Sequence, residues 1–185
     1  MHIVAKDTKW PEVRFEESEP RKDGLHLGTI IKSLMDKTGL GYKGKGFDDM
    51  ELTAEIGTLW ERVFSMVMAA KYSVRPPQME LDGVWLSLDG MGPDPEGKVP
   101  LVVIEQKFTW KSTKSSPVDN FYYMAQLQSY CKAIGTKVAI MHIFYCNGDY
   151  KGSGPIYREA RVEFTQHEID KNWSMILKHK REMGL

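Results

Sequence analysis

Cysteine is almost absent from this sequence. The chain of 185 residues contains two, Cys131 and Cys146. Two thiols on one chain are too few for a disulfide framework, a four-thiolate zinc site or a cysteine-ligated iron–sulfur cluster. We therefore interpret both as reduced thiols and expect no iron–sulfur cofactor.

The sequence also lacks long apolar runs and an excess of positive charge. No stretch approaches the roughly 18 to 20 apolar residues that cross a membrane, and the first residues show no basic-then-apolar signal region. Lys plus Arg and Asp plus Glu number 25 each, so a surface that binds nucleic acid has to be local. These absences predict a cytoplasmic protein without a membrane partner.

The length of the chain suits one domain with its own core. We predict a single domain over residues 1–185. It is divided into a polar, Pro- and Gly-punctuated arm with a short helix (1–50), a catalytic core (51–164) and a C-terminal helix (165–185).

Four segments have the apolar spacing of amphipathic helices. They are residues 26–37, 53–72, 117–134 and 165–181. Gly39 and Gly135 are placed to end the first and third of them. Thr165 and Glu168 form the capping-box pattern that opens the last.

Four further segments are rich in residues that favour strands. They are residues 79–88, 99–108, 137–146 and 156–164. We interpret the first two as antiparallel strands joined by a long loop, although Asp82-Gly83 within the first can be a turn or a bulge and leaves its pairing open. The third is interpreted as a central strand, with Asn147-Gly148 as the turn into the fourth. The mixture predicts an α/β fold of the mixed α+β kind, with a central mixed β-sheet flanked by helices.

Two opposite charges, Glu105 and Lys107, follow the apolar residues Val102 to Ile104. Alternate side chains of a strand share a face, so these two point together while Ile104 and Phe108 point to the other layer. A carboxylate and an ammonium beside a buried strand need each other or a metal, because unpaired charge is costly to bury. For these two residues alone, a strand-end salt bridge is the simpler interpretation.

A third charged residue, Asp89, ends the preceding apolar segment. Carboxylates on adjacent strands can share Mg²⁺, which takes one or two carboxylates along with water and phosphate oxygens. The backbone carbonyl of Gln106 offers one more oxygen. Such an ion lowers the pKa of its bound water while a nearby lysine stabilises a phosphate, so the pattern favours phosphodiester hydrolysis.

Two of the predicted helices carry the remaining candidates. Glu61 lies at the margin of the apolar stripe of its helix, where it can reach a site at the edge of the core. A solvated helix glutamate is an equally good interpretation, and Glu55 is the competing acid. On the third helix, Gln126 is one turn from both Tyr122 and Tyr130, which forms a polar ridge able to hold a lysine or a DNA backbone.

Four motifs occur in chain order: Gly57-x-x-x-Glu61, Ser87-Leu88-Asp89-Gly90, Glu105-x-Lys107, and Gln126-Leu127-Gln128 with Tyr130. Together they resemble the PD-(D/E)XK nuclease superfamily, most closely its RecB and lambda exonuclease (YqaJ-like) branch. The resemblance implies a restriction-endonuclease-like core, with Asp89 and Glu105 as metal ligands and Lys107 as the catalytic lysine. It also implies that Glu61 is an acidic ligand, direct or through water, and that Gln126 supports the site or contacts DNA.

The sequence departs from the pattern at two positions. Glu61 stands where RecB-type relatives often have a histidine, which is the lambda-exonuclease style of motif, and Leu88 stands where a proline often precedes the aspartate. The leucine does not affect the metal chemistry that the resemblance implies.

The implied activity is a metal-dependent DNA exonuclease that uses Mg²⁺, with Mn²⁺ as a substitute. The setting we expect is phage or mobile-element recombination or repair in a bacterial or phage-infected cell, with an annealing or single-strand-binding protein as a partner. A structure-specific or restriction-like endonuclease of the same fold is the alternative, and a catalytically silent DNA-binding subunit is a third hypothesis. The residues we expect to contact DNA are Tyr130, Lys111, Lys114, Arg21, Lys22 and His26.

Overall fold

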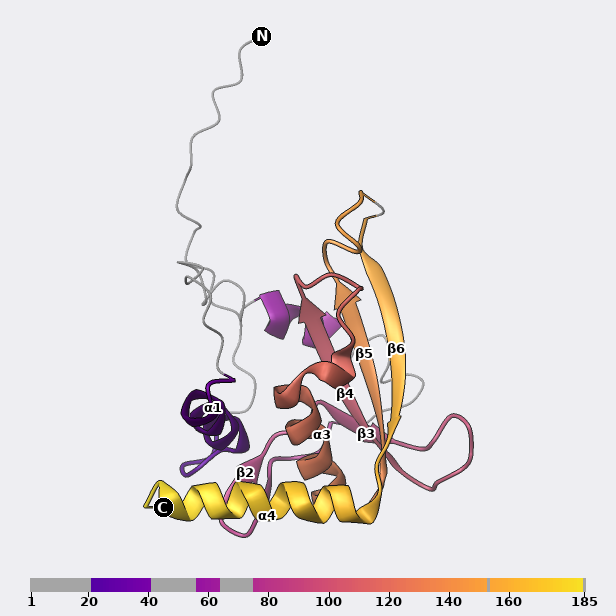
Figure 1. Cartoon of the computed structure of the whole chain (residues 1–185). Helices are drawn as coiled ribbons and strands as arrows, with labels where there is room; N and C mark the ends of the chain where they lie inside the picture. Colours follow the sequence, from indigo (N-terminus) through magenta and orange to yellow (C-terminus); the bar gives the residue numbers. More distant parts are fainter. Residues whose placement is uncertain (1–20, 41–55, 64–74, 153, 185) are drawn as a thin grey trace.

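The computed structural model describes residues 21–40, 56–63, 75–152 and 154–184. A four-stranded mixed sheet forms the centre of this part of the chain, with helices on both faces (Figure 1). The predicted mixed α/β architecture is confirmed. No helix of the described ranges is long and apolar enough to span a lipid bilayer.

The sheet has the order β3-β4-β5-β6. Its strands are β3 (Gly90–Gly92), β4 (Val102–Thr109), β5 (Val138–Tyr145) and β6 (Ile156–Glu163). β4 and β5 are parallel and are joined through helix α3 (Phe121–Ile134), whereas both outer pairs are antiparallel. β5 is therefore a central strand, as predicted, although its connection to β6 is longer than a two-residue turn.

The segment 79–88 forms a hairpin of its own. β1 (Met79–Leu81) pairs with β2 (Val84–Leu86) in a separate two-stranded sheet. Asp82 and Gly83 between them have positive φ angles of 51° and 71°, the backbone that a tight two-residue hairpin turn requires. The prediction that this segment pairs with residues 99–108 was wrong, because the turn closes the hairpin locally. The antiparallel neighbour of β4 is β3, from the region expected to be a loop.

The third predicted helix begins later than expected. Pro117–Asp119 form a 3-10 turn, and the α-helix starts after Asn120, whose side chain accepts a hydrogen bond from the backbone N–H of Tyr123 at 3.4 Å. Of the predicted helix over 53–72, residues 56–63 are helical; its remainder and the arm before residue 21 lie outside the described residues.

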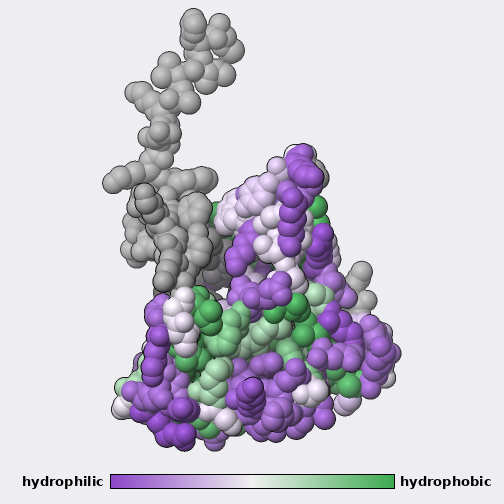
Figure 2. Space-filling view, viewed as in Figure 1, coloured by the Kyte–Doolittle hydropathy of each residue, from purple (hydrophilic) through white to green (hydrophobic). Residues whose placement is uncertain are grey.

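Three helices cover one face of the sheet. α1 (Leu27–Thr38) and α4 (Gln166–Glu182) pack against α3, and α4 runs across the end of α3 along the lower edge of Figure 1. The main core lies between these helices and the sheet. On the outer surface of this view, hydrophilic residues gather along α4 and at the raised end of the sheet, with apolar residues between them (Figure 2).

The strand alternation places the charged residues on the helix-covered face. Val103 of β4 belongs to the main core, and Glu105, Lys107 and Thr109 follow it on the same face. Phe108 points the other way, where its ring lies 6.3 Å from that of Trp60 in the helical segment 56–63. The predicted division of β4 into a charged and an apolar face is confirmed.

Helix α4 opens with the predicted capping box. The backbone N–H of Glu168 donates to Thr165 Oγ1 at 3.2 Å, and the N–H of Thr165 donates to Glu168 Oε2 at 2.7 Å. Replacing Thr165 with alanine removes the first bond and is expected to lower the free energy of unfolding by about 1 kcal/mol. Chemical denaturation measures the change. Lys171→Ala, on the exposed side of the same helix, is the control and is expected to stay within about 0.5 kcal/mol of the wild type.

Candidate active site

Glu105 and Lys107 form a buried ion pair on β4. The Glu105 side chain is 1% exposed and that of Lys107 is 16% exposed, and Lys107 Nζ donates to Glu105 Oε1. The second carboxylate oxygen, Glu105 Oε2, is buried and accepts no hydrogen bond within the described part of the chain. A buried carboxylate oxygen without a donor is costly unless a cation or another donor meets it.

Asp89 lies directly beside this pair. Gly90 pairs with Ile104 in the antiparallel register, and extending that register by one residue places Asp89 opposite Glu105. Asp89 Oδ2 accepts a hydrogen bond from the backbone N–H of Gln106 at 2.8 Å. The hydrogen bond holds the carboxylate against the middle of β4, next to Glu105, so the two acids lie side by side as the sequence predicted.

Glu61 approaches the same place from the helical segment 56–63. Burial, with a further contribution from the negative charge of Asp89, raises the pKa of Glu61 to about 7 against the opposing effect of Lys107 and Arg75. These charges act on Glu61 because it lies within electrostatic reach of both strands. The charges of Asp89 and Lys107 therefore act on Glu61, and its role as an acidic ligand stays a prediction.

The charges within the site favour an added cation. Burial, together with repulsion from Asp89, raises the pKa of Glu105 to about 8 against the opposing effect of Lys107. Burial alone would lower the pKa of Lys107, but attraction to Glu105 and Asp89 outweighs burial and raises it. Lys107 therefore stays protonated at neutral pH, where its charge opposes the rise in the pKa of both Glu61 and Glu105.

These residues fit a divalent metal ion through oxygen donors. Carboxylate oxygens are the ligands that Mg²⁺ prefers, and Glu105 Oε2 is a buried oxygen with no protein donor. Within the described ranges, however, no three acidic, histidine or cysteine side chains are close enough together to surround one ion. The ligand set of Asp89, Glu105, Glu61 and the Gln106 carbonyl stays a prediction.

Gln126 and Tyr130 link helix α3 to the segment that carries Asp89. Gln126 Nε2 donates to the Tyr130 hydroxyl at 2.8 Å, and that hydroxyl donates to the backbone carbonyl of Ser87 at 2.7 Å. Ser87 is two residues before Asp89, so the chain of hydrogen bonds positions the acid. Tyr130 is 3% exposed. A direct DNA contact by Tyr130 is not supported, because its hydroxyl is committed inside the core.

Tyr123 is a site residue whose role the sequence reasoning missed. The ammonium of Lys107 lies 5.4 Å from the centre of the Tyr123 ring, a cation–π distance. The available signal was helical spacing, since Tyr123 is three residues before Gln126 and seven before Tyr130 and so shares their side of α3.

The basic residues expected to contact DNA lie in two places. Lys111 and Lys114 are exposed on the connection from β4 to α3, and Arg21 and Lys22 are exposed just before α1. His26 forms a hydrogen bond through Nε2 to the backbone carbonyl of Lys22, four residues earlier in the chain, at 2.9 Å. That nitrogen is therefore engaged by a neighbouring residue. Their role in binding DNA stays a prediction.

Comparison with known proteins shows a shared fold. No family model matches the chain, and no curated protein matches it in sequence. One solved structure, a phage-related exonuclease from Haemophilus somnus, aligns with 83% of this chain over 78% of its own length. The sequence identity is 12% and the TM-score is 0.51. A second, the complex of dAMP with LHK-Exo, an alkaline exonuclease from Laribacter hongkongensis, aligns with 84% of this chain over 78% of its own length. The sequence identity is 13% and the TM-score is 0.50. A third, SSO0001, aligns with 87% of this chain over 78% of its own length, at 12% sequence identity and a TM-score of 0.51.

Proposed function

We propose that this chain is a Mg²⁺-dependent deoxyribonuclease that hydrolyses phosphodiester bonds from a DNA end. The observation that carries the proposal is the buried Glu105–Lys107 ion pair on β4, with Asp89 bonded to the neighbouring Gln106 N–H and with Glu105 Oε2 left without a donor in the described part of the chain. The fold supports it, since two of the solved structures that share it are exonucleases.

Asp89 and Glu105 would hold the metal ion, with Glu61 acting directly or through water. A bound Mg²⁺ supplies a water of lowered pKa and neutralises charge on the phosphate, and we expect Mn²⁺ to substitute. The buried oxygen of Glu105 supports this assignment, because it has no hydrogen-bond donor among the residues that the structure describes.

In this proposal Lys107 supplies a positive charge and N–H hydrogen-bond donors. Its pKa is raised by Glu105 and Asp89, so it is an ammonium at neutral pH and cannot serve as a general base. An ammonium carries three N–H donors, and Glu105 accepts from one of them. The others suit an oxygen of the scissile phosphate, where a fixed positive charge in a partly dry site stabilises the transition state.

Gln126, Tyr130 and Tyr123 position these groups. The hydrogen bonds from Gln126 through Tyr130 to Ser87 hold the backbone that leads into Asp89. The Tyr123 ring packs against the Lys107 ammonium and limits where that ammonium can move.

The test is digestion of linear and covalently closed circular DNA with Mg²⁺ or with EDTA. An exonuclease degrades only the linear form, and only with the metal. Cutting of the circle would replace the exonuclease by the endonuclease alternative. DNA binding without digestion of either form would identify a silent binding subunit and overturn the proposal. End-labelled strands then give the polarity.

We propose phage or mobile-element recombination as the setting, with an annealing or single-strand-binding protein as the partner that receives the exposed strand. Co-purification of the chain with such a protein encoded beside it tests this part.

Metal binding is expected to stabilise the fold as well as activate it. An ion at about 100 times its dissociation constant adds about 2.7 kcal/mol to the free energy of unfolding. For a chain of this size that raises the melting temperature by roughly 5–10 °C. Thermal denaturation with Mg²⁺ and with EDTA measures the shift. The same shift in Asp89→Asn would show that the ion binds elsewhere.

A further inference from the structure

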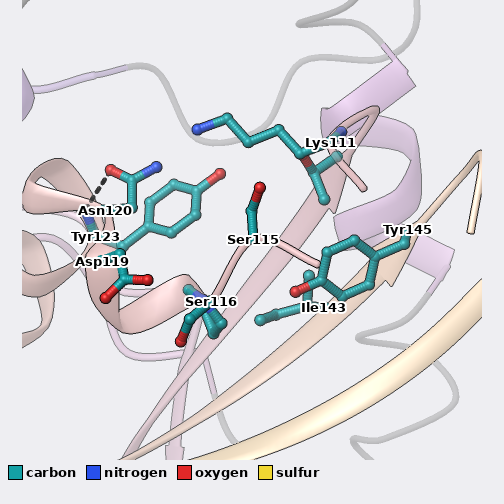
Figure 3. Close-up of a pocket in the computed structure, with 10 residues that line it drawn as sticks. Lys111, Ser115, Ser116, Asp119, Asn120, Tyr123, Ile143 and Tyr145 are labelled. Carbon is teal, nitrogen blue, oxygen red and sulfur yellow. Dashed lines mark hydrogen bonds between the residues drawn. The ribbon is translucent and has the colours of Figure 1, made fainter. Parts of the chain in front are cut away.

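A cavity of about 280 Å³ lies beside the proposed active site (Figure 3). It opens at the carboxyl ends of β4 and β5, next to the start of α3. In sheets with parallel strands this is the end at which ligands bind. Its lining includes Thr109, Lys111, Ser115, Asn120, Tyr123 and Tyr145.

Two residues join the cavity to the catalytic lysine. Tyr123 lines the cavity and also packs its ring 5.4 Å from the Lys107 ammonium. Thr109 lies two residues after Lys107 on the same face of β4, about 7 Å further along the strand. In duplex DNA one nucleotide advances about 3.4 Å along the axis, so the cavity is within one or two nucleotides of the reaction centre.

The walls of the cavity are held in place by hydrogen bonds between loops. The backbone N–H of Thr113 donates to the Gly148 carbonyl at 3.1 Å, and Arg158 Nη1 donates to the Thr113 carbonyl at 2.9 Å. The N–H of Lys111 donates to Thr109 Oγ1 at 3.1 Å. The first two bonds tie the β4–α3 connection to the β5–β6 region and the third holds the start of that connection against β4, so the cavity is formed before a ligand arrives.

The polar groups of the cavity suit a phosphate. Figure 3 shows the Lys111 side chain extended across the cavity toward Asn120, with the Ser115 hydroxyl pointing into the space between Tyr123 and Tyr145. The positive end of the α3 dipole adds to the charge of Lys111, since the helix starts just after Asn120. One carboxylate, Asp119, opposes them, but Figure 3 shows it on the other side of the Tyr123 ring.

The apolar surface of the cavity suits a sugar or a base. The rings of Tyr123 and Tyr145 and the side chain of Ile143 line it. Aromatic rings are the side chains on which bases of single strands stack. A volume of about 280 Å³ lies just under the roughly 300–1,000 Å³ of ordinary ligand pockets, a size that suits one nucleotide.

We propose that this cavity binds one nucleotide of the substrate strand next to the scissile bond, with its phosphate at Lys111 and Ser115 and its sugar or base against Tyr123. The inference rests on the proposed function for the identity of the strand as DNA. It extends that function by assigning a substrate subsite to residues outside the catalytic group.

Calorimetric titration in EDTA, without catalysis, tests the subsite. The probes are thymidine monophosphate, thymidine and inorganic phosphate. We expect the monophosphate to bind at least about tenfold more tightly than either part, and Lys111→Ala to weaken it by at least about tenfold through loss of a charge-assisted hydrogen bond. Lys171→Ala, an exposed lysine on α4, should bind like the wild type. Equal binding of phosphate and monophosphate, or unchanged binding by Lys111→Ala, overturns the proposal.

Kinetics on linear DNA separate this subsite from the catalytic group. Lys111→Ala is expected to raise KM by at least about tenfold with little change in kcat, since the lost contact holds ground state and transition state alike. A fall in kcat at constant KM would contradict a binding subsite. If the wild type digests no DNA, the proposed function fails, but the titration still decides whether the cavity binds a nucleotide.

Discussion

Lys107→Ala is expected to lower kcat for DNA hydrolysis by about 100- to 1,000-fold, the usual effect of removing one preorganised charge from a transition state. Lys107 is the one ammonium placed against both Glu105 and Asp89 in the described structure. Since its pKa is raised, its charge is present over the whole working pH range. No other described lysine is bonded to Glu105, so a neighbour cannot replace it.

The fold should survive this substitution. Removing the ammonium leaves Glu105 buried without its partner, but a carboxyl group with a raised pKa can take up a proton in place of the lost ion pair. The rate of release of nucleotides from labelled linear DNA measures activity, and circular dichroism checks folding. Lys171→Ala is the matched control, since it removes an exposed lysine of α4. Equal digestion by Lys107→Ala and wild type would mean that the mechanism proposed for Lys107 is wrong.

Asp89→Asn is expected to lower activity by at least about 100-fold, since even groups behind the metal ligands change activity by about 10- to 100-fold. The amide keeps the shape of the side chain and an oxygen that can accept from the Gln106 N–H. The substitution removes the negative charge with which Asp89 is proposed to bind the metal ion. The same variant should lose the Mg²⁺-dependent rise in melting temperature.

Asp82→Asn provides the control for Asp89→Asn. Asp82 lies in the hairpin turn at a φ of 51°, a conformation that asparagine also tolerates. Its Oδ2 accepts from Trp173 Nε1 at 2.8 Å, a bond that an amide oxygen can keep. Activity should stay close to wild type. A loss equal to that of Asp89→Asn would show that the assay reports folding, and the assignment of Asp89 would fall.

Much of the fold could be predicted because it depends on neighbours in sequence. The capping box of α4, the glycine that ends α3 and the two faces of β4 follow from capping chemistry and from residue spacing. The shared direction of Glu105 and Lys107 is of the same kind. It needs only a strand, whichever partners that strand has.

The candidate site was predictable as a set of residues, but its arrangement was not. Nothing local in Tyr130 distinguishes a residue exposed to DNA from one buried against the Ser87 carbonyl, 43 residues away. The role of Tyr123 depends on where α3 packs on β4. Both are decided by contacts between elements that are far apart in the chain.

The sequence by itself determined most of the helices and strands and which charged residues lie on them, because these properties are set within a few residues. Only the tertiary structure decided that residues 79–88 close on themselves, that Gly90–Gly92 pairs with β4, and that Asp89 is therefore set opposite Glu105. It also decided that a cavity opens beside Lys107. Strand register and loop packing depend on the burial of the whole core, and a one-residue slip in register would send Asp89 to the other face.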